Sequence, residues 1–525
     1  MYNQLNKRVK TLQKLQLEAN LLGTKTGLEK ESLRVTPEGF ISQLKHPEIL
    51  GSALTHPSIT TDYSEALMEL ITPPLATAKE ALDYLLDIES FVYQNIGDEL
   101  LWTTSMPCII HGEDDIQIAD YGSSNAGKMK SVYRHGLAWR YGKMMQVIAG
   151  IHFNHSFSES FWINYQKIQS NQSSLQDFID TSYMGLTRNL LRYGWLIPYL
   201  FGSSPAICKS FLNGQPMSKN MQMLNNNTVY EPYGTSLRMG DIGYTNLKEE
   251  KAGIKANYNC LHSYINSLRC ATSTICPEYE KIGIKVDGQY RQLNAAILQI
   301  ENEYYSTVRP KQILKGMEKP VDALGQRGIQ YIELRSLDID VYHPAGMTSK
   351  QLYFLKTFML FCLLQDSPDI ESKEQAAINN NQSTVAHLGR KPGLTLDRNG
   401  KSVSLKAWAN ELLDAMQPVA ALLSGTTQEE DYLDSLQQQI ELVKHPDTTP
   451  SARIIDEIVG NNESYYEFAK RKSNEHREIF LKRQLSATKE QEFRQLAKKS
   501  IKKQQEIESS DTINFDTFLK DYFNQ

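Results

Sequence analysis

The stretch GLEKESLRV, residues 27–35, places two carboxylates on one side of a β-prone segment. Side chains alternate between the two faces of a strand, so Glu29 and Glu31 share a face with Leu33 and Val35. Two like charges about 7 Å apart repel each other unless water solvates both or a cation lies between them. Solvation at a sheet edge explains an isolated Glu-x-Glu most simply, so the rest of the sequence must decide between solvation and a metal site.

Other predicted strands also carry polar side chains that share a face. In the predicted strand 151–158, alternation puts His152 and Asn154 on one face. In the predicted strand 328–342 it puts Glu333 and Arg335 on one face. In the predicted strand 296–305 the residues that share a face are Gln299, Glu301, Glu303 and Tyr305. A cross-strand ion pair or a hydrogen-bonded core histidine explains each strand taken alone. Together they indicate a polar surface that faces water or a ligand.

Residues 62–71, within TTDYSEALMELITPP, are predicted to form a helix. Asp62 and Glu65 have the spacing of a capping box, which explains both side chains without a ligand. Glu69 is not explained in that way. It lies between two apolar residues, and a carboxylate in apolar surroundings needs a partner.

At least four segments then offer inward carboxylates, and one offers an imidazole. Oxygen ligands without thiolates favour Mg²⁺ or Mn²⁺ over structural zinc. Mg²⁺ of this kind commonly neutralises charge on a transferred phosphoryl group. Arg335, two residues from Glu333, is placed to contact that phosphate. The sequence contains no Gly-x4-Gly-Lys-Ser/Thr motif, so it does not predict a P-loop enzyme.

The composition argues against several classes of protein. A formal net charge of −5 over 525 residues gives no overall basic field for nucleic acid. Residues 1–22 lack the apolar core of a signal peptide. The apolar run 352–364 is broken by Lys356 and is too short to span a bilayer, so it predicts a buried helix. The six cysteines are scattered without a CxxC pair, which indicates free thiols in a reducing compartment. We expect a cytoplasmic protein without membrane or nucleic-acid partners.

The remaining segments are mostly helical in pattern. The Asn/Gln-rich residues 377–384 predict a surface loop, and the charged composition beyond residue 460 predicts a solvated surface helix. Other helices are predicted at 1–25, 76–97, 128–150 and 173–201.

Ten segments follow one another in a recognisable order. They are GLEKESLRV (27–35), GSALTHPSITTDYSEALMELITPP (51–74), SMPC (105–108), YGSSNAGKMKSVYRHGLAWRYG (121–142), IHFNHS (151–156), GWLIPYLFGSSPAIC (194–208), PYGTSLRMGDIGYTN (232–246), LQIENEYYSTVRPK (298–311), YIELRSLDID (331–340) and GRKPGLTL (389–396). Together they resemble the proteobacterial type of glutamate–cysteine ligase, also called γ-glutamylcysteine synthetase. The resemblance covers about residues 20–460 and is far more specific than a lone Glu-x-Glu.

The resemblance implies a reaction and a fold. The family joins L-glutamate to L-cysteine with ATP, the first step of glutathione synthesis. ATP phosphorylates the glutamate γ-carboxylate, and the cysteine amine then attacks the acyl phosphate to give γ-glutamylcysteine. The implied fold is α+β and similar to glutamine synthetase: a curved antiparallel sheet forms a funnel with surrounding helices and metal ions inside. We expect a catalytic domain at 1–460 and a charged helical extension at 461–525, packed on or beside it.

The resemblance also implies roles for individual residues, with Mg²⁺ or Mn²⁺ as cofactor and ATP as co-substrate. The metal-ligand motifs match Glu29, Glu31, Asp62, Glu69, His152 and Glu333. Glu333 and Arg335 are the expected catalytic residues, with Arg335 near the transferred phosphoryl group. The positions that line the amino-acid pockets match Tyr133, Arg238, Tyr244 and Tyr305. The positions at the nucleotide match Asn154 and Arg335.

Two other interpretations stay open. A carboxylate–amine ligase that combines glutamate with a different amine would carry the same metal carboxylates and differ around Tyr244 and Tyr305. A non-catalytic metabolite-binding relative would lack at least one of these carboxylates, and none is missing. The resemblance further implies a monomer. Because glutathione contains the γ-glutamyl group, we also expect it to inhibit in competition with glutamate. Residues 366–390 contain no cysteine, so we do not expect the redox-sensitive disulfide of some relatives.

Overall fold

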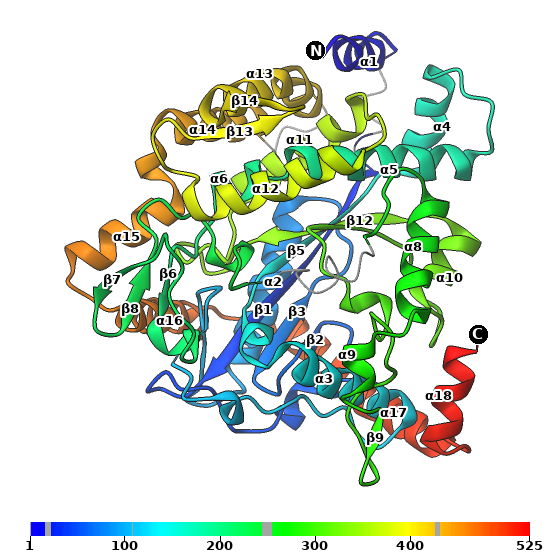
Figure 1. The fold of residues 1–525 in the computed structure, drawn as a ribbon, viewed down its shortest axis with the longest axis vertical. Helices are drawn as coiled ribbons and strands as arrows, with labels where there is room; N and C mark the ends of the chain where they lie inside the picture. The colour runs from blue at the N-terminus through cyan, green and yellow to red at the C-terminus, as the bar shows by residue number, and fades with distance from the viewer. Residues whose placement is uncertain are drawn as a thin grey trace.

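The computed structural model describes residues 2–15, 21, 23–107, 109–243, 255–425 and 431–524. Its centre is an antiparallel sheet of seven strands, in the order β11-β12-β5-β1-β3-β2, with β4 paired to β1. Helices surround this sheet (Figure 1), and the expected α+β class is confirmed. The strands are β1 (Lys25–Val35), β2 (Ile59–Thr61), β3 (Leu67–Ile71), β4 (Leu100–Leu101), β5 (Ile151–Ser156), β11 (Val308–Lys311) and β12 (Tyr331–Leu337).

The long strand β1 holds the sheet together, because it pairs with β3, β4 and β5. Nearly all of its residues are buried, and the strands on both sides satisfy its backbone groups. Its register sets Glu29 opposite His152 of β5 and Glu31 opposite Glu69 of β3. In an antiparallel pair, directly opposed side chains lie on the same face. These side chains therefore meet on one face of the sheet.

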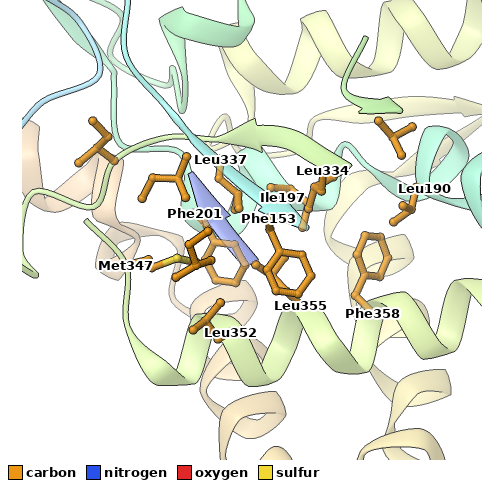
Figure 2. Packing of buried hydrophobic residues seen from close by; sticks show 14 of the residues in the cluster. Phe153, Leu190, Ile197, Phe201, Leu334, Leu337, Met347, Leu352, Leu355 and Phe358 are labelled. Atoms are coloured by element: carbon orange, nitrogen blue, oxygen red, sulfur yellow. The ribbon is translucent and has the colours of Figure 1, made fainter. Parts of the chain in front are cut away.

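The other face of the sheet packs against helix α11 (Ser349–Leu364) (Figure 2). Phe153 of β5 and Leu334 of β12 are opposed in register, and their side chains lie over Leu355 and Phe358 of the helix. All four are essentially inaccessible to solvent. Burying an apolar side chain of this size stabilises a fold by roughly 1.5–3 kcal/mol. The predicted buried helix at 352–364 is confirmed.

Charged side chains on this buried face form one-to-one pairs. Lys30 donates to Glu89 at 2.8 Å and to the carbonyl of Pro344 at 3.0 Å. Arg34 donates to Glu99 at 2.8 Å. The side chains of both pairs are almost completely buried, and a buried charge that loses its partner is strongly destabilising.

The predicted helix at 62–71 is wrong. The segment is a hairpin of β2 and β3, closed by a backbone hydrogen bond from Asp62 N to Leu67 O at 2.9 Å. Glu65 does not form a capping box. Its carboxylate accepts from the backbone amides of His46 at 2.7 Å and Asp120 at 2.9 Å. Glu69 still reaches the polar face, because β3 places it opposite Glu31.

The predicted strand at 296–305 is also wrong. The segment contains the 3₁₀ turn η7 (Glu301–Glu303) and an isolated bridge from Ala296 to Ile275, and it forms no strand. The carboxylate of Glu303 is buried and accepts from Arg140 at 2.9 Å, from Tyr141 at 2.8 Å and from the amide of Gln299 at 2.6 Å. Glu303 is therefore held by side chains from outside the segment as well as by the segment's own backbone, and the polar residues do not form a face of a strand.

The Asn/Gln-rich residues 377–384 lie in helix α12 (Ser372–Leu388), so the predicted surface loop is wrong. The predicted solvated helix beyond residue 460 is only partly correct. Helices α16 (Tyr465–Lys482) and α17 (Ala487–Ser510) carry charges outside but bury Phe468, Phe480 and Phe493 in the main core. α16 and α17 both pack on α2 (Ala78–Tyr93).

The remaining elements surround the central sheet. The further helices are α1 (Asn3–Lys14), α3 (Asn125–Tyr141), α4 (Glu159–Ile168), α5 (Leu175–Tyr193), α6 (Leu196–Phe201), α8 (Leu261–Ser273), α9 (Pro277–Glu280), α10 (Pro320–Arg327), α13 (Leu405–Ser424), α14 (Tyr432–Lys444), α15 (Pro450–Gly460) and α18 (Phe515–Phe523). Small sheets form from β6 (Ala206–Cys208), β7 (Gln222–Asn225) and β8 (Thr228–Tyr230), from β9 (Lys285–Val286) and β10 (Gln289–Tyr290), and from β13 (Thr395–Arg398) and β14 (Lys401–Ser404). Across the described residues, no helix combines the length and the apolar character needed to cross a membrane.

Candidate active site

A cavity of about 900 Å³ lies against the polar face of the sheet. Four strands contribute charged side chains to it, and helix α3 forms part of its wall. Most of the site residues predicted from the sequence line this cavity: Glu29, Glu31, Asp62, Glu69, Tyr133, His152, Arg238, Tyr305, Glu333 and Arg335.

One group in the cavity has the arrangement of metal ligands. Glu29, His152 and Glu333 each offer a donor atom, and these atoms lie within 4.8 Å of one another. His152 Nδ1 lies 3.0 Å from Glu29 Oε2 and 3.9 Å from Glu333 Oε1. Glu333 Oε2 is buried and has no hydrogen-bond partner among the described residues. Two carboxylates and an imidazole, with one oxygen still unsatisfied, fit a divalent cation.

Three further carboxylates lie beside this group. Glu31 accepts from the amide of Gly150 at 2.8 Å, and its other oxygen lies 3.8 Å from His152 Nε2. Burial, together with the neighbouring Glu29 and Asp62, raises the pKa of Glu69 well above its ordinary value. Burial also raises the pKa of Glu31. Carboxylates that resist ionisation in this way indicate a place where a cation would be stabilised.

The carboxylates of the metal-ligand group are instead held in their charged form. Burial raises the pKa of Glu333, but Lys311 at 3.6 Å and Arg335 at 3.3 Å outweigh it, so the pKa lies below its ordinary value. The pKa of Glu29 is also lowered, because its hydrogen bond with His152 overcomes the effect of burial. Ionised carboxylates are the form that ligates Mg²⁺.

The residues predicted to contact substrates are placed as follows. Arg238 belongs to the 3₁₀ turn η6 (Leu237–Met239) and donates to the carbonyl of Arg335 at 2.9 Å. Tyr305 donates to Gln146 at 3.1 Å at the cavity wall. Asn154 is not among the described residues that line the cavity; its amide donates to Glu29 at 2.8 Å and thereby orients that carboxylate. Tyr244 lies outside the described residues.

Several cationic side chains in the cavity are absent from the sequence-based prediction. Lys130 and Arg134 are one turn apart on α3, and both lie over the ring of Tyr121. Burial and the adjacent Arg134 lower the pKa of Lys130 to about 8. Arg309 and Lys311 come from one face of β11. The sequence did contain a signal for each pair. Lys130 and Arg134 are four residues apart in a helical segment, and Arg309 and Lys311 are two apart in VRPK, so each pair shares a face of its element.

Comparisons with known proteins agree with this geometry. The sequence profile of the glutamate–cysteine ligase family matches residues 9–385. A glutamate–cysteine ligase from Alcanivorax borkumensis is 44% identical over 99% of both chains. One from Pseudomonas putida is 46% identical over 94% of both chains. The chain belongs to the glutamate–cysteine ligase family.

A solved structure supports the same assignment. The crystal structure of a glutamate–cysteine ligase from Francisella tularensis, in complex with AMP, is 35% identical and superposes with a TM-score of 0.89. It covers 95% of this chain and 97% of that one. A bifunctional glutathione synthetase from Pasteurella multocida shares the fold at a TM-score of 0.72 and 24% identity, and its match takes in 90% of this chain and 55% of that one.

The predicted family, fold class and reaction are therefore confirmed. The chain is an ATP-dependent ligase that joins glutamate to cysteine in the first step of glutathione synthesis.

Proposed function

We propose that the polar face of the sheet binds and activates the glutamate γ-carboxylate for attack by the cysteine amine. The observation that carries this assignment of the site is that ligand atoms of Glu29, His152 and Glu333 converge within 4.8 Å. The cationic side chains of Arg309, Lys311 and Arg335 line the same cavity. A carboxylate is a poor acyl donor, so it must be phosphorylated before an amine can displace its oxygen. The site therefore has to accommodate phosphate charge and an acyl carbon together.

The metal ligands proposed for this site are Glu29, His152 and Glu333, with Glu31, Asp62 and Glu69 for further Mg²⁺ or Mn²⁺. A divalent cation bound there would neutralise phosphate oxygens. Asn154 supports the site by holding one oxygen of Glu29, so its contribution to nucleotide binding is through that carboxylate. Such an orienting partner commonly changes metal affinity or activity 10–100-fold when it is removed, an order-of-magnitude figure.

Arg335 is the proposed catalytic contact for the transferred phosphoryl group. Its guanidinium lies 3.3 Å from Glu333 and 3.4 Å from His152 Nδ1, at the edge of the proposed metal site. A planar fork fixed in place stabilises phosphoryl oxygens without reorganising as charge develops. Lys311 and Arg309, on the neighbouring strand, add positive charge on the same side.

The amino-acid ends of the substrates are proposed to lie against Tyr133, Arg238, Tyr244 and Tyr305. Arg238 is 2% exposed and is held by Asp338 and by the carbonyl of Arg335. A guanidinium held in this way binds a substrate carboxylate with little loss of side-chain freedom. The attacking amine must be neutral and close to the acyl carbon, and such positioning accounts for much of the rate enhancement in ligations.

The finer biological features are proposals of the same kind. We infer that the enzyme is a cytoplasmic monomer, that residues 1–460 form its catalytic domain, and that residues 461–525 are an extension packed on it. Glutathione contains the γ-glutamyl group, so it should compete with glutamate for the same pocket. Inhibition that persists at saturating glutamate would place glutathione at a separate site.

The decisive experiment is ATP turnover with glutamate and Mg²⁺, with and without cysteine, followed by mass analysis of the product. We expect ADP release to require cysteine and a γ-linked dipeptide to form. EDTA should abolish turnover, and added Mg²⁺ or Mn²⁺ should restore it. ADP release that responds to another amine would contradict the assignment of cysteine as acceptor, and turnover unaffected by EDTA would contradict the metal site.

A further inference from the structure

One wall of the cavity is formed by helix α12 and by a loop that packs on the end of this helix. The helix contributes Gln375, Asn379 and Ser383 to the wall, and the loop contributes residues 238–241. His387 lies four residues after Ser383, so the two side chains are neighbours on the surface of the helix. His387 is only 7% exposed and is not among the described residues that line the cavity. It therefore lies behind this wall rather than on it.

The imidazole of His387 bridges two carboxylates. Its Nδ1 lies 2.9 Å from both carboxylate oxygens of Glu231, the residue that follows β8. Its Nε2 lies 3.3 Å from the backbone nitrogen of Asp241 and 3.3 Å from Oδ1 of the same residue. Glu231 is inaccessible to solvent. A buried ion pair stabilises a fold little more than apolar residues of similar volume would, so stability alone does not explain this pair.

Two glycines bring the loop into direct contact with this pair. A Cβ atom on Gly234 would lie 2.8 Å from Cβ of Glu231, and one on Gly240 would lie 2.8 Å from Cε1 of His387. Both distances are shorter than carbon atoms tolerate, so a larger residue at either position would require a shift of the loop. The loop therefore touches Glu231 near its start and His387 where it approaches the cavity.

Arg238 lies in the turn that Gly240 closes. The amide of Gly240 donates to the carbonyl of Leu237 at 3.1 Å, directly after the turn η6. The guanidinium of Arg238 donates to the carbonyl of Arg335 at 2.9 Å and lies 3.9 Å from Asp338. The place of Arg238 in the cavity therefore depends on β12 and its end for the side chain, and on the loop for the backbone.

Other hydrogen bonds hold the start of the loop on the end of α12 independently of His387. The amides of Thr235 and Ser236 donate to the carbonyl of Ala386 at 2.8 and 3.2 Å, and the Thr235 hydroxyl donates to the carbonyl of Val385 at 3.0 Å. These carbonyls belong to the last turn of the helix, where partners within the helix are lacking. A substitution of His387 should therefore leave the loop attached to α12 and change the position of the turn that carries Arg238.

We propose that His387, paired with Glu231, is a positioning residue that holds the loop 234–241 so that Arg238 meets the carboxylate of an amino-acid substrate. The inference rests on the proposed function, which places Arg238 in the amino-acid pocket. His387 touches no substrate in this arrangement and acts only through the loop. Its loss should therefore weaken the binding of an amino acid and leave the binding of ATP unaffected.

The test measures kcat and the KM values for glutamate, cysteine and ATP in full-length variants. His387→Ala should raise the KM for glutamate or cysteine about tenfold, the effect of losing a hydrogen bond to a charged group. The KM for ATP should stay within about twofold, and a smaller number of folded molecules would lower kcat without changing any KM. Glu231→Gln keeps the size of the side chain but removes its charge, so it should raise the same KM by less. Asn380→Ala, an exposed position on the same helix, is the matched control and should keep the wild-type values.

A double variant separates positioning of Arg238 from a general loss of structure. Arg238→Lys should itself raise the same KM, because a point charge replaces a planar fork. Adding His387→Ala to Arg238→Lys should then raise that KM by less than about twofold, since the residue through which His387 acts is already changed. A further rise as large as in the wild-type background would overturn the proposal, and so would an equal rise in the KM for ATP.

The single variants distinguish a failure of this inference from a failure of the proposed function. Unchanged KM values in Arg238→Lys would overturn the proposed role of Arg238, and the inference with it. A raised KM in Arg238→Lys, with unchanged KM values in His387→Ala, would overturn only the positioning by His387.

Discussion

Buried charged side chains are arranged differently on the two faces of strand β1. On the face that packs toward α2 and α11, Lys30 has Glu89 as its own hydrogen-bonded partner. On the cavity face, Glu29 and Glu31 share the single imidazole of His152 with a third carboxylate, Glu333. One-to-one pairing lets a strand be buried at a tolerable desolvation cost. Several carboxylates around one imidazole leave ligand atoms that a cation can occupy. The paired charges therefore contribute to folding, whereas the clustered charges are available for chemistry.

The largest expected effect comes from the cavity face. Glu333→Gln should lower kcat at least about 1000-fold, equivalent to about 4 kcal/mol of activation free energy, because a metal ligand is lost while size is kept. Its free energy of unfolding should change by less than about 1 kcal/mol. Steady-state kinetics and urea unfolding measure the two quantities. Glu301→Gln, a buried carboxylate outside the described cavity wall, is the control, and near-normal turnover of Glu333→Gln would remove it from the ligand set.

The opposite pattern is expected on the other face. Glu89→Gln leaves the buried Lys30 charge without its ionic partner, which should cost about 3–5 kcal/mol of stability. The folded fraction should keep the wild-type kcat. Urea unfolding tests the first statement, and activity divided by folded fraction tests the second. The double variant Lys30→Met/Glu89→Leu should recover much of the stability, and failure of Glu89→Gln to destabilise would show that this pair is not important for folding.

A smaller loss of kcat is expected at Arg335, a cationic side chain beside the carboxylates of the cavity face. Arg335→Lys keeps the positive charge beside Glu333 but replaces a planar fork with a point charge. We expect kcat to fall roughly 10–100-fold, because phosphate oxygens lose a bidentate contact. Stability should be unchanged, since Arg335 is partly exposed in the cavity. Wild-type turnover of this variant, measured as ADP release in steady-state kinetics, would exclude contact of Arg335 with the phosphoryl group.

The smallest expected effect is on stability, and it concerns a network of charged side chains outside both faces of β1. His387 of α12 lies 2.9 Å from both oxygens of Glu231 and 3.3 Å from Asp241, near the loop that carries Arg238. Burial lowers the pKa of His387, but Glu231 and Asp241 outweigh it, so the pKa lies above its ordinary value.

The network should therefore stabilise the fold fully below about pH 6.5, and its contribution should be lost as the pH rises through the folded-state pKa. Thermal unfolding of the wild type and His387→Gln across that range measures it. The two proteins should differ most at low pH. A difference that grows with pH would contradict the charged form of His387.

The sequence predicted the strands whose side chains alternate clearly. In β5, His152 and Asn154 share a polar face while Phe153 points into the core, and β12 repeats this pattern with Glu333 and Arg335 around Leu334. The candidate ligands followed from these faces together with the family motifs. The roles of these residues remain predictions.

The failures have local causes. The hairpin of β2 and β3 was missed because Asp62 and Glu65 imitate the spacing of a capping box, while Glu65 actually binds two distant backbone amides. Residues 296–305 alternate like a strand, but Glu303 pairs with Arg140, far away in sequence. Long-range hydrogen bonds of this kind leave no periodic signal.

The cavity draws its wall from residues as distant in sequence as Glu29 and Tyr522. During synthesis on the ribosome, the strands that carry the carboxylates emerge long before α18, so the cavity stays incomplete until that helix has docked. Loop closure over such a separation is slow compared with local helix formation. Nascent chains of this ligase should therefore form the carboxylate face of the sheet first and complete the cavity wall last. The ligand atoms stay open to solvent during that interval.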